Sequence, residues 1–244
     1  MPAAVEALPP LKTIVRKLAS HYGPPAAPPT TGAFEMVLWE SVAYLADDER
    51  RSKAFALLKS TVGTTPAAIL KARGPALRDV TRHGILAERF AGKLREAARI
   101  AVDDYDGDLD RVVAGPVPAA RKALRKFPGI GIPGAEKILL FLRRHPSLAP
   151  ESNGLRVLTR LGLCREEKSY AAGYAAACDL AARELGDDLD VLMTTHRLLR
   201  RHGQTLCTRS GPGCDRCPLR QDCRYARTHE SGRGRLTSSS RRPS

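Results

Sequence analysis

Apolar residues recur every three or four positions along most of this chain, which is the spacing of an amphipathic α-helix. The stretch AERFAGKLREAARIAVDDY, residues 87–105, shows the pattern clearly, with Phe90, Leu94 and Ala98 on one face. Sustained alternation of β-branched residues, the pattern of a strand, does not occur in the sequence. The hydrophobic pattern therefore predicts an all-α protein.

Breaks rich in proline and glycine divide this pattern into ten or so short helices. Thr65 and Pro66 suit the N-cap and the first turn of one of them. Residues 22–32, YGPPAAPPTTG, are proline-rich and are expected to form a link or an extended strap. The predicted helices lie at 33–62 (one helix or two), 65–73, 87–105, 108–115, 118–127, 134–145, 152–163, 169–186 and 188–207.

The composition is that of a globular protein with a sizeable core. Of the 244 residues, 43% are hydrophobic and 27% are charged. No apolar run approaches the roughly 18–20 residues of a membrane span, and the N-terminus lacks the charged start and apolar block of a secretory signal. We therefore expect no membrane partner and a reducing, cytoplasmic setting, close to the nucleoid if the source is bacterial.

The charge balance favours a polyanionic partner. Lys and Arg number 40 against 26 Asp and Glu, which gives a formal net charge of +14. Nucleic acid is the favoured partner, and a merely basic surface is the alternative. Part of the excess lies in residues 227–244, which are rich in Arg, Ser and Gly and are predicted to form a disordered basic tail.

The segment LRKFPGIGIPGAEKILLF, residues 124–141, predicts two helices joined by a tight turn. Gly129 and Gly131 flank the apolar Ile130, and the second helix is expected to start near Gly134. The backbone amides of such a turn point outward together at a helix N-terminus and can bind a phosphate. An ordinary αα-hairpin is the alternative, although the full pattern is more specific than two glycines.

Four of the six cysteines crowd into one short loop near the end of the chain: Cys207, Cys214, Cys217 and Cys223. Four thiolates can bind Zn²⁺ or a [4Fe–4S] cluster. Zinc ribbons commonly use two separated pairs of cysteines, whereas this loop contains a single CxxC, which favours the cluster. Cys164 and Cys178 lie in apolar helical stretches and are expected in the core rather than at a metal.

These two motifs together resemble the endonuclease III branch of the helix-hairpin-helix DNA glycosylases. The cysteine loop follows the hairpin by about seventy residues, and the resemblance runs from about Phe34 to Tyr225. It implies a monomeric base-excision repair enzyme that holds double-stranded DNA by its backbone and flips out a damaged or mismatched base. The DNA-binding residues that it implies are Gly129, Ile130, Gly131, Gly134 and Lys137.

The family fold implies two lobes, with DNA across the cleft between them. In this chain, residues 26–145 would form a six-helix barrel that contains the hairpin, and residues 146–226 would form a cluster lobe. The N-terminal segment, 1–25, would pack on the cluster lobe, and residues 227–244 would form the tail.

The catalytic positions depart from the family pattern. In endonuclease III a lysine two residues after the second hairpin glycine acts as an amine nucleophile, and this chain has Pro133 there. Lys137, one turn further on, is either a substitute nucleophile, a solvated lysine or a phosphate contact. The family's catalytic aspartate maps to Glu151, whose carboxylate can stabilise a sugar cation and activate water. Simple stabilisation of a helix N-terminus is the alternative for Glu151.

The stretch FEMVLWESVAYLADDER resembles the family's first barrel helix. Glu40 lies where the adenine glycosylases that act opposite 8-oxoguanine carry an acid that protonates the base. Its apolar neighbours suit a general acid, and a glutamate paired with a nearby arginine is the alternative. Leu45 replaces the glutamine that plugs the DNA gap, and Tyr44 is a candidate wall of the base pocket.

These features predict a monofunctional DNA N-glycosylase with water as the nucleophile and a [4Fe–4S] cluster. The alternatives are a glycosylase with AP-lyase activity that uses Lys137, an inactive DNA-binding iron–sulfur scaffold, and a cluster-based redox or regulatory protein. The adenine-glycosylase pattern is incomplete, because Pro133 replaces its hairpin serine. The sequence therefore leaves the identity of the excised base open, with uracil, thymine, adenine and a damaged base as the candidates.

Overall fold

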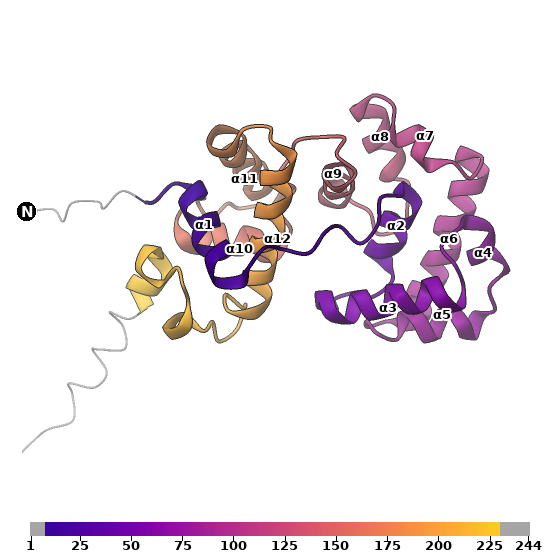
Figure 1. Cartoon of the computed structure of the whole chain (residues 1–244), viewed down its shortest axis with the longest axis horizontal. Helices are drawn as coiled ribbons and strands as arrows, with labels where there is room; N and C mark the ends of the chain where they lie inside the picture. The colour runs from indigo at the N-terminus through magenta and orange to yellow at the C-terminus, as the bar shows by residue number, and fades with distance from the viewer. Residues whose placement is uncertain (1–7, 230–244) are drawn as a thin grey trace, which may run out of the picture. The chain divides into compact units, whose positions relative to one another are not determined.

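The structure, a computed structural model, describes residues 8–229, and every regular element in that range is helical. The predicted all-α fold class is confirmed. Figure 1 labels the α-helices, which are α1 (Leu11–Tyr22), α2 (Ala33–Ser41), α3 (Asp48–Thr61), α4 (Pro66–Lys71), α5 (Gly74–Thr81), α6 (Ala87–Tyr105), α7 (Leu109–Val113), α8 (Val117–Leu124), α9 (Ile132–Phe141), α10 (Ser152–Leu161), α11 (Tyr170–Leu185) and α12 (Leu189–Thr205). Two short 3₁₀ helices, η1 (Cys214–Arg216) and η2 (Arg220–Asp222), lie in the cysteine loop. Within residues 8–229, no helix has both the length and the apolar character needed to span a membrane.

Side-chain caps explain where several of the helices begin. The Thr65 hydroxyl accepts a hydrogen bond from the Ala68 N–H at 3.2 Å, which confirms the predicted start of α4. The carboxylates of Asp47 and Asp188 cap α3 and α12 in the same way. Each such cap stabilises its helix by about 1 kcal/mol.

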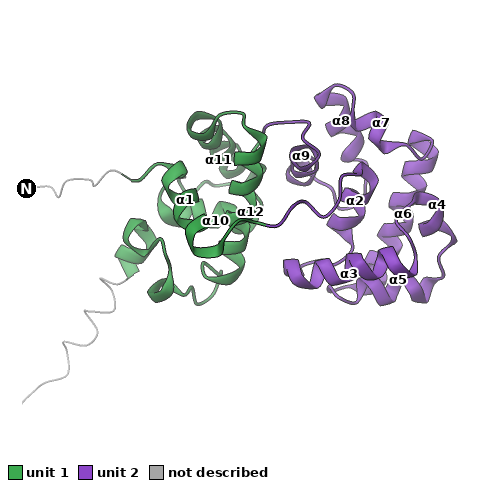
Figure 2. Ribbon diagram, in the orientation of Figure 1, with its two compact units in different colours: residues 1–25, 147–244 green, residues 26–146 purple. Residues whose placement is uncertain are grey.

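Two compact units divide the chain, and Figure 2 colours them separately. Unit 2 contains residues 26–146 and helices α2 to α9. Unit 1 contains residues 1–25 and 147–244, so the chain leaves this unit after α1 and returns to it before α10.

Helix α6 is the central element of unit 2, where it packs against α2, α4 and α5. Its apolar face buries Phe90, Leu94 and Ala98, the residues that the sequence pattern placed together. Helix α2 is buried over most of its length and also packs against α7 and α9. Glu40 therefore lies near the end of a largely buried helix.

Helix α12 is the central element of unit 1, where it packs against α10 and α1. A glycine is required at its crossing with α10, because a Cβ on Gly203 would lie only 2.7 Å from Asn153 Cβ. Helix α1 completes this core with Leu11, Ile14 and Leu18, which are fully buried.

The sequence did not predict two of these helices. Helix α1 follows two prolines, and the resemblance places its residues only in an N-terminal segment. Helix α5 starts at Gly74 and Pro75, a pair that is typical of a loop, although proline is also favoured in the first helical turn.

Some boundaries also differ from the prediction. Region 33–62, where one helix or two were predicted, forms two, and Leu45 between them adopts a left-handed conformation with φ of 56°. Helix α9 begins at Ile132 rather than near Gly134, since Pro133 is accommodated in its first turn. Residues 227–229, assigned to the disordered tail, belong to a helical segment that starts at 224. The rest of that tail, 230–244, and residues 1–7 lie outside the described part of the chain.

Candidate active site

The predicted hairpin consists of α8, a glycine turn and α9. Gly129 has φ of +90°, a conformation that favours glycine, and the Ile130 N–H donates to the Phe127 carbonyl at 3.0 Å. Gly131 is the N-cap of α9, with extended backbone. The first amides of α9 lack partners within the helix and can therefore meet an anion, although Pro133 contributes no N–H.

An ion-pair cluster joins the two helices of the hairpin. The buried carboxylate of Glu136 on α9 pairs with the guanidinium of Arg121 on α8, and its second oxygen lies 3.3 Å from His145 Nε2. Glu136 is only 6% exposed. A cationic side chain also lies close to the turn, because a Cβ added to Gly129 would approach Lys93 Nζ to 3.3 Å.

A buried ion pair brings together two residues that the sequence singled out separately. Lys137 Nζ lies 2.6 Å from Glu40 Oε2, and their side chains are only 10% and 12% exposed. Arg51 approaches the same oxygen at 3.9 Å, so the predicted arginine neighbour of Glu40 is present. The burial of Lys137, which is 8% exposed as a whole residue, argues against a solvated side chain, and its phosphate contact stays a prediction.

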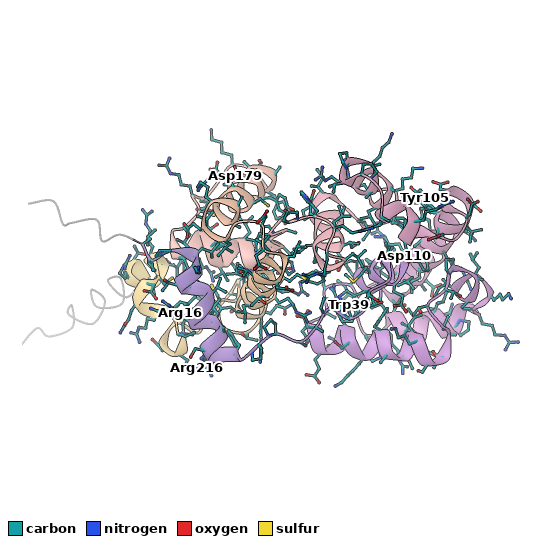
Figure 3. All side chains as sticks on the ribbon, turned by 45° about the horizontal axis from the view of Figure 1, so that its top comes forward. Arg16, Trp39, Tyr105, Asp110, Asp179 and Arg216 are labelled. Carbon is teal, nitrogen blue, oxygen red and sulfur yellow. The ribbon has the colours of Figure 1, made fainter. Side chains whose placement is uncertain are left out.

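Trp39, the neighbour of Glu40 in the chain, links α2 to α3 through an aromatic contact. Figure 3 labels Trp39, whose ring packs edge-on against Phe55 with centroids 5.4 Å apart. The guanidinium carbon of Arg51 lies 6.0 Å from the centre of the Trp39 ring, a cation–π distance. The apolar residues of α2 that precede Trp39 are buried, as the sequence predicted, and two cations lie beside the Glu40 carboxylate.

Tyr44 and Leu45 lie in an exposed loop that follows α2. Tyr44 stacks on Phe90 with centroids 4.5 Å apart, and Leu45 is 72% exposed. A second loop joins them, since the Ile85 N–H donates to the Tyr44 carbonyl at 3.1 Å. Ile85 and Leu86 are also more than half exposed. We call Leu45, Ile85 and Leu86 the apolar tip.

Sequence reasoning missed Ile85 and Leu86. Their signal was a pair of large apolar residues directly after Gly84 and before α6, outside the apolar face of that helix. Gly84 itself is required by packing, because a Cβ there would clash with the backbone of Tyr44.

Glu151 is the N-cap of α10 and is held at both carboxylate oxygens. Oε1 accepts from the Asn153 N–H at 3.1 Å, and Oε2 accepts from Asn153 Nδ2 at 3.0 Å. Arg200 on α12 donates to Oε2 at 2.9 Å. The sequence did not identify Asn153 or Arg200, because neither contact follows from a local pattern.

The segment that leads into Glu151 is also fixed by side chains. Ala149 has φ of 47°, and the ring of His196 contacts its carbonyl at 3.0 Å. The Tyr170 hydroxyl donates to the Pro150 carbonyl at 3.4 Å. Burial, and next the charge of Glu151, raise the pKa of Tyr170 to about 12, so this phenol stays protonated. Glu151 lies in unit 1, whereas Glu40 and Lys137 lie in unit 2.

The four clustered cysteines line one hollow in unit 1, together with residues of α10 and α12. Cys217 Sγ accepts from the Leu219 N–H at 3.4 Å, and His202 Nε2 lies 3.5 Å away. Arg160 donates to Cys207 Sγ at 3.4 Å. Burial raises the pKa of the Cys217 thiol to about 11, a shift that a bound metal would reverse by taking the thiolate.

Two arginines of α10 anchor the loop that carries these cysteines. Arg156 donates to the carbonyls of Cys207 and Gly203, at 2.9 and 2.7 Å. Arg160 donates to the Thr208 carbonyl at 2.7 Å. The other two cysteines stay apart from the loop: Cys164 is buried, as predicted, and Cys178 is half-buried.

No protein-family model matches the chain. An endonuclease III of Rickettsia conorii is 27% identical over 163 residues, which cover 66% of this chain and 70% of that protein. An endonuclease III of Thermotoga maritima is 25% identical over 202 residues, which cover 83% of this chain and 87% of that protein. A trapped covalent intermediate of endonuclease III with DNA has the same fold, with a TM-score of 0.71 at 20% identity over 91% of this chain and 100% of that one.

The chain is therefore similar to endonuclease III proteins in sequence and in fold, which supports the endonuclease III-like branch of the helix-hairpin-helix DNA glycosylase superfamily. The residues of the cysteine loop fit the [4Fe–4S] cluster that is typical of endonuclease III. In residues 8–229, no three His, Cys, Asp or Glu side chains lie close enough together to hold a single metal ion. In a four-iron cluster each thiolate binds a different iron, so its ligands stand further apart than around zinc. Four cysteines around one hollow, with N–H groups directed at two sulfurs, match that arrangement.

Proposed function

We propose that this endonuclease III-like chain is a monofunctional DNA N-glycosylase of base-excision repair, in which water attacks the sugar. The observation that carries the proposal is Glu151, a carboxylate fixed by three hydrogen bonds at the start of α10. Pro133 supports it, because a proline side chain offers no amine at the position of the family's nucleophile. A carboxylate fixed in this way can stabilise the sugar cation that forms as the base leaves and can orient the attacking water.

The proposed substrate is double-stranded DNA with a damaged or mismatched base. The hairpin supports backbone binding, since the Gly129–Gly131 turn leads directly into the unpaired amides of α9. The apolar tip supports base flipping, because large exposed apolar side chains can fill the gap that a flipped nucleotide leaves in the stack. Leu45 thereby takes the place that the resemblance assigns to a plugging residue.

In this proposal Glu40 orients the departing base. Its ion pair with Lys137 favours the charged carboxylate, which accepts hydrogen bonds, whereas the neighbouring ammonium donates them. An acceptor and a donor side by side can contact the edge of a base, and the ammonium can supply a proton as the base leaves.

In this proposal Cys207, Cys214, Cys217 and Cys223 hold the [4Fe–4S] cluster. When bound, the cluster ties the loop together and thereby stabilises unit 1. The loop carries Arg209, Arg216 and Arg220, which add positive charge for DNA.

A second candidate function is a glycosylase with AP-lyase activity that uses Lys137. The ion pair favours it, because Glu40 lies 2.6 Å from the ammonium and can accept its proton to leave an amine. Attack of that amine on the anomeric carbon of the sugar would displace the base, and opening of the sugar ring would then give a Schiff base, which borohydride reduces to a stable bond.

Glutamine variants test the proposed site. Glu151→Gln and Glu40→Gln keep the size of each side chain and remove its charge. We expect single-turnover base excision to fall by about 10²–10⁴-fold in each, with little change in DNA affinity. The assay uses duplexes that carry one G·U, G·T, A·8-oxoguanine or thymine glycol site. Wild-type excision by both variants would overturn the placement of the site, and a wild-type protein that processes no duplex would favour the inactive scaffold.

A further inference from the structure

Arg200 makes a contact with Glu151 that helix capping does not require. Capping of α10 is complete when Oε1 accepts the Asn153 N–H at 3.1 Å. Oε2 nevertheless receives two further donors, Asn153 Nδ2 at 3.0 Å and Arg200 at 2.9 Å. The arginine contact comes from another helix, α12, and from a residue 49 positions away in the chain.

The crossing of α10 and α12 brings Arg200 to this position. The two helices lie close together at Gly203, where a Cβ would lie 2.7 Å from Asn153 Cβ. Arg200 precedes Gly203 by about one helical turn, and Glu151 precedes Asn153 by two residues. The close crossing therefore sets the guanidinium beside the carboxylate.

This ion pair is sheltered from solvent on both sides. The Arg200 side chain is 12% exposed and the Glu151 side chain is 20% exposed. Exposed ion pairs contribute little to stability, because water and salt screen the attraction between their charges. A sheltered pair is screened less, so each side chain holds the other more firmly in place.

We propose that Arg200 is a positioning residue, which fixes the Glu151 carboxylate for its reaction. The inference rests on the proposed function. Glutamate has one more rotatable bond than the aspartate of the family pattern, so its carboxylate has more conformations to lose in a reactive geometry. Asn153 restrains both oxygens from the same helix end, and Arg200 restrains Oε2 from α12. A displacement of about 1 Å at such a group can cost on the order of 10²-fold in rate.

The neighbouring Arg201 provides a matched control. It has the same charge and lies on the same helix, but it donates to the Tyr22 carbonyl at 3.0 Å and stacks 4.8 Å from the Tyr22 ring centre. Arg200→Gln and Arg201→Gln therefore change the net charge equally, and only the first removes a contact with Glu151.

The experiment measures single-turnover excision on the lesion duplex that the wild-type protein processes fastest, with DNA affinity and thermal midpoint determined for each variant. We expect Arg200→Gln to excise about 10–100-fold more slowly than wild type at nearly unchanged affinity, and Arg201→Gln to stay within about twofold. Arg200→Lys, which keeps a cation, should recover part of the rate. In a Glu151→Gln background, Arg200→Gln should cause no further loss, because its effect acts through Glu151.

The outcomes separate this inference from the function on which it rests. Equal rates for Arg200→Gln and Arg201→Gln, with Glu151→Gln strongly impaired, would overturn the inference and leave the proposed function standing. Full additivity of Arg200→Gln with Glu151→Gln would also overturn it, since the arginine would then act elsewhere. A wild-type rate in Glu151→Gln, or a wild-type protein that processes no duplex, would overturn both.

Discussion

Lys137→Met should destabilise unit 2 strongly, although lysine-to-methionine changes at solvated positions have little effect. The ammonium lies 2.6 Å from Glu40 Oε2, and both side chains are about 90% buried. Methionine keeps the length and apolar character of the lysine side chain but removes the ammonium from the buried Glu40 carboxylate, which Arg51 still approaches at 3.9 Å. The loss is therefore electrostatic rather than a cavity.

The size of the effect follows from the burial. Breaking a buried ion pair costs roughly 3–5 kcal/mol, and the presence of Arg51 favours the lower end, about 3 kcal/mol. A unit of about 120 residues unfolds with an entropy of about 0.25 kcal/mol/K, so its thermal midpoint should fall by roughly 12 °C. Adding Glu40→Gln should recover much of this loss, because it removes the buried negative charge that has lost its ammonium.

Differential scanning calorimetry with a matched control measures this shift. Lys126→Met removes an ion pair of similar length, 2.8 Å to Asp104, whose side chains are 50% and 38% exposed. We expect its midpoint to match that of the wild type. A Lys137→Met midpoint equal to that of Lys126→Met, or a double variant no more stable than Lys137→Met alone, would refute the buried pair.

Three further predictions concern the hairpin, a carboxylate of α2 and the cysteine loop. Gly129→Ala should cost about 1–2 kcal/mol of stability, because the φ of +90° at this position strains any other residue. Gly131→Ala, at φ of −86°, should fold normally and yet weaken DNA binding. Unchanged DNA binding of Gly131→Ala in an anisotropy titration would contradict the hairpin role. Burial opposes ionisation of Glu35, but hydrogen bonds from Thr30 and Thr64 and the charge of Lys59 outweigh burial and lower the pKa of this carboxyl. Glu35→Gln should therefore lower the thermal midpoint at neutral pH, and the difference from wild type should vanish as the pH falls through the lowered pKa. A difference in midpoint that does not depend on pH would contradict this. Anaerobically purified protein should be brown, with about four irons per chain. The Cys214→Ser variant should lose the colour, and unit 1 should be destabilised more than unit 2. Colourless protein with stoichiometric zinc would contradict the cluster.

The sequence predicted the features that depend on residues close together in the chain. Helix α6 has the predicted ends, Thr65 caps α4, and the all-α fold follows from the apolar spacing. The cysteine loop was recognisable because its four cysteines lie within one short segment. Helix α9 began earlier than predicted because Pro133 fits a first turn as well as it ends a helix.

The contacts that the sequence could not predict join distant residues. Lys137 meets Glu40 across the packing of α9 on α2, and Arg200 meets Glu151 across the packing of α12 on α10. Each pairing depends on helix rotation and crossing, which periodicity does not specify. Ile85 and Leu86 were missed because exposed apolar residues are conspicuous only once burial is known.

The central claim is that base excision proceeds with water as the nucleophile, and product analysis with borohydride tests it most directly. The protein is incubated with each lesion duplex, and the strands are resolved before and after hot alkali, with a parallel sample treated with borohydride. We predict strand breaks only after alkali and little or no covalent protein–DNA complex. Strand breaks without alkali, together with a borohydride-trapped complex that disappears in Lys137→Ala, would contradict the claim and identify Lys137 as the nucleophile.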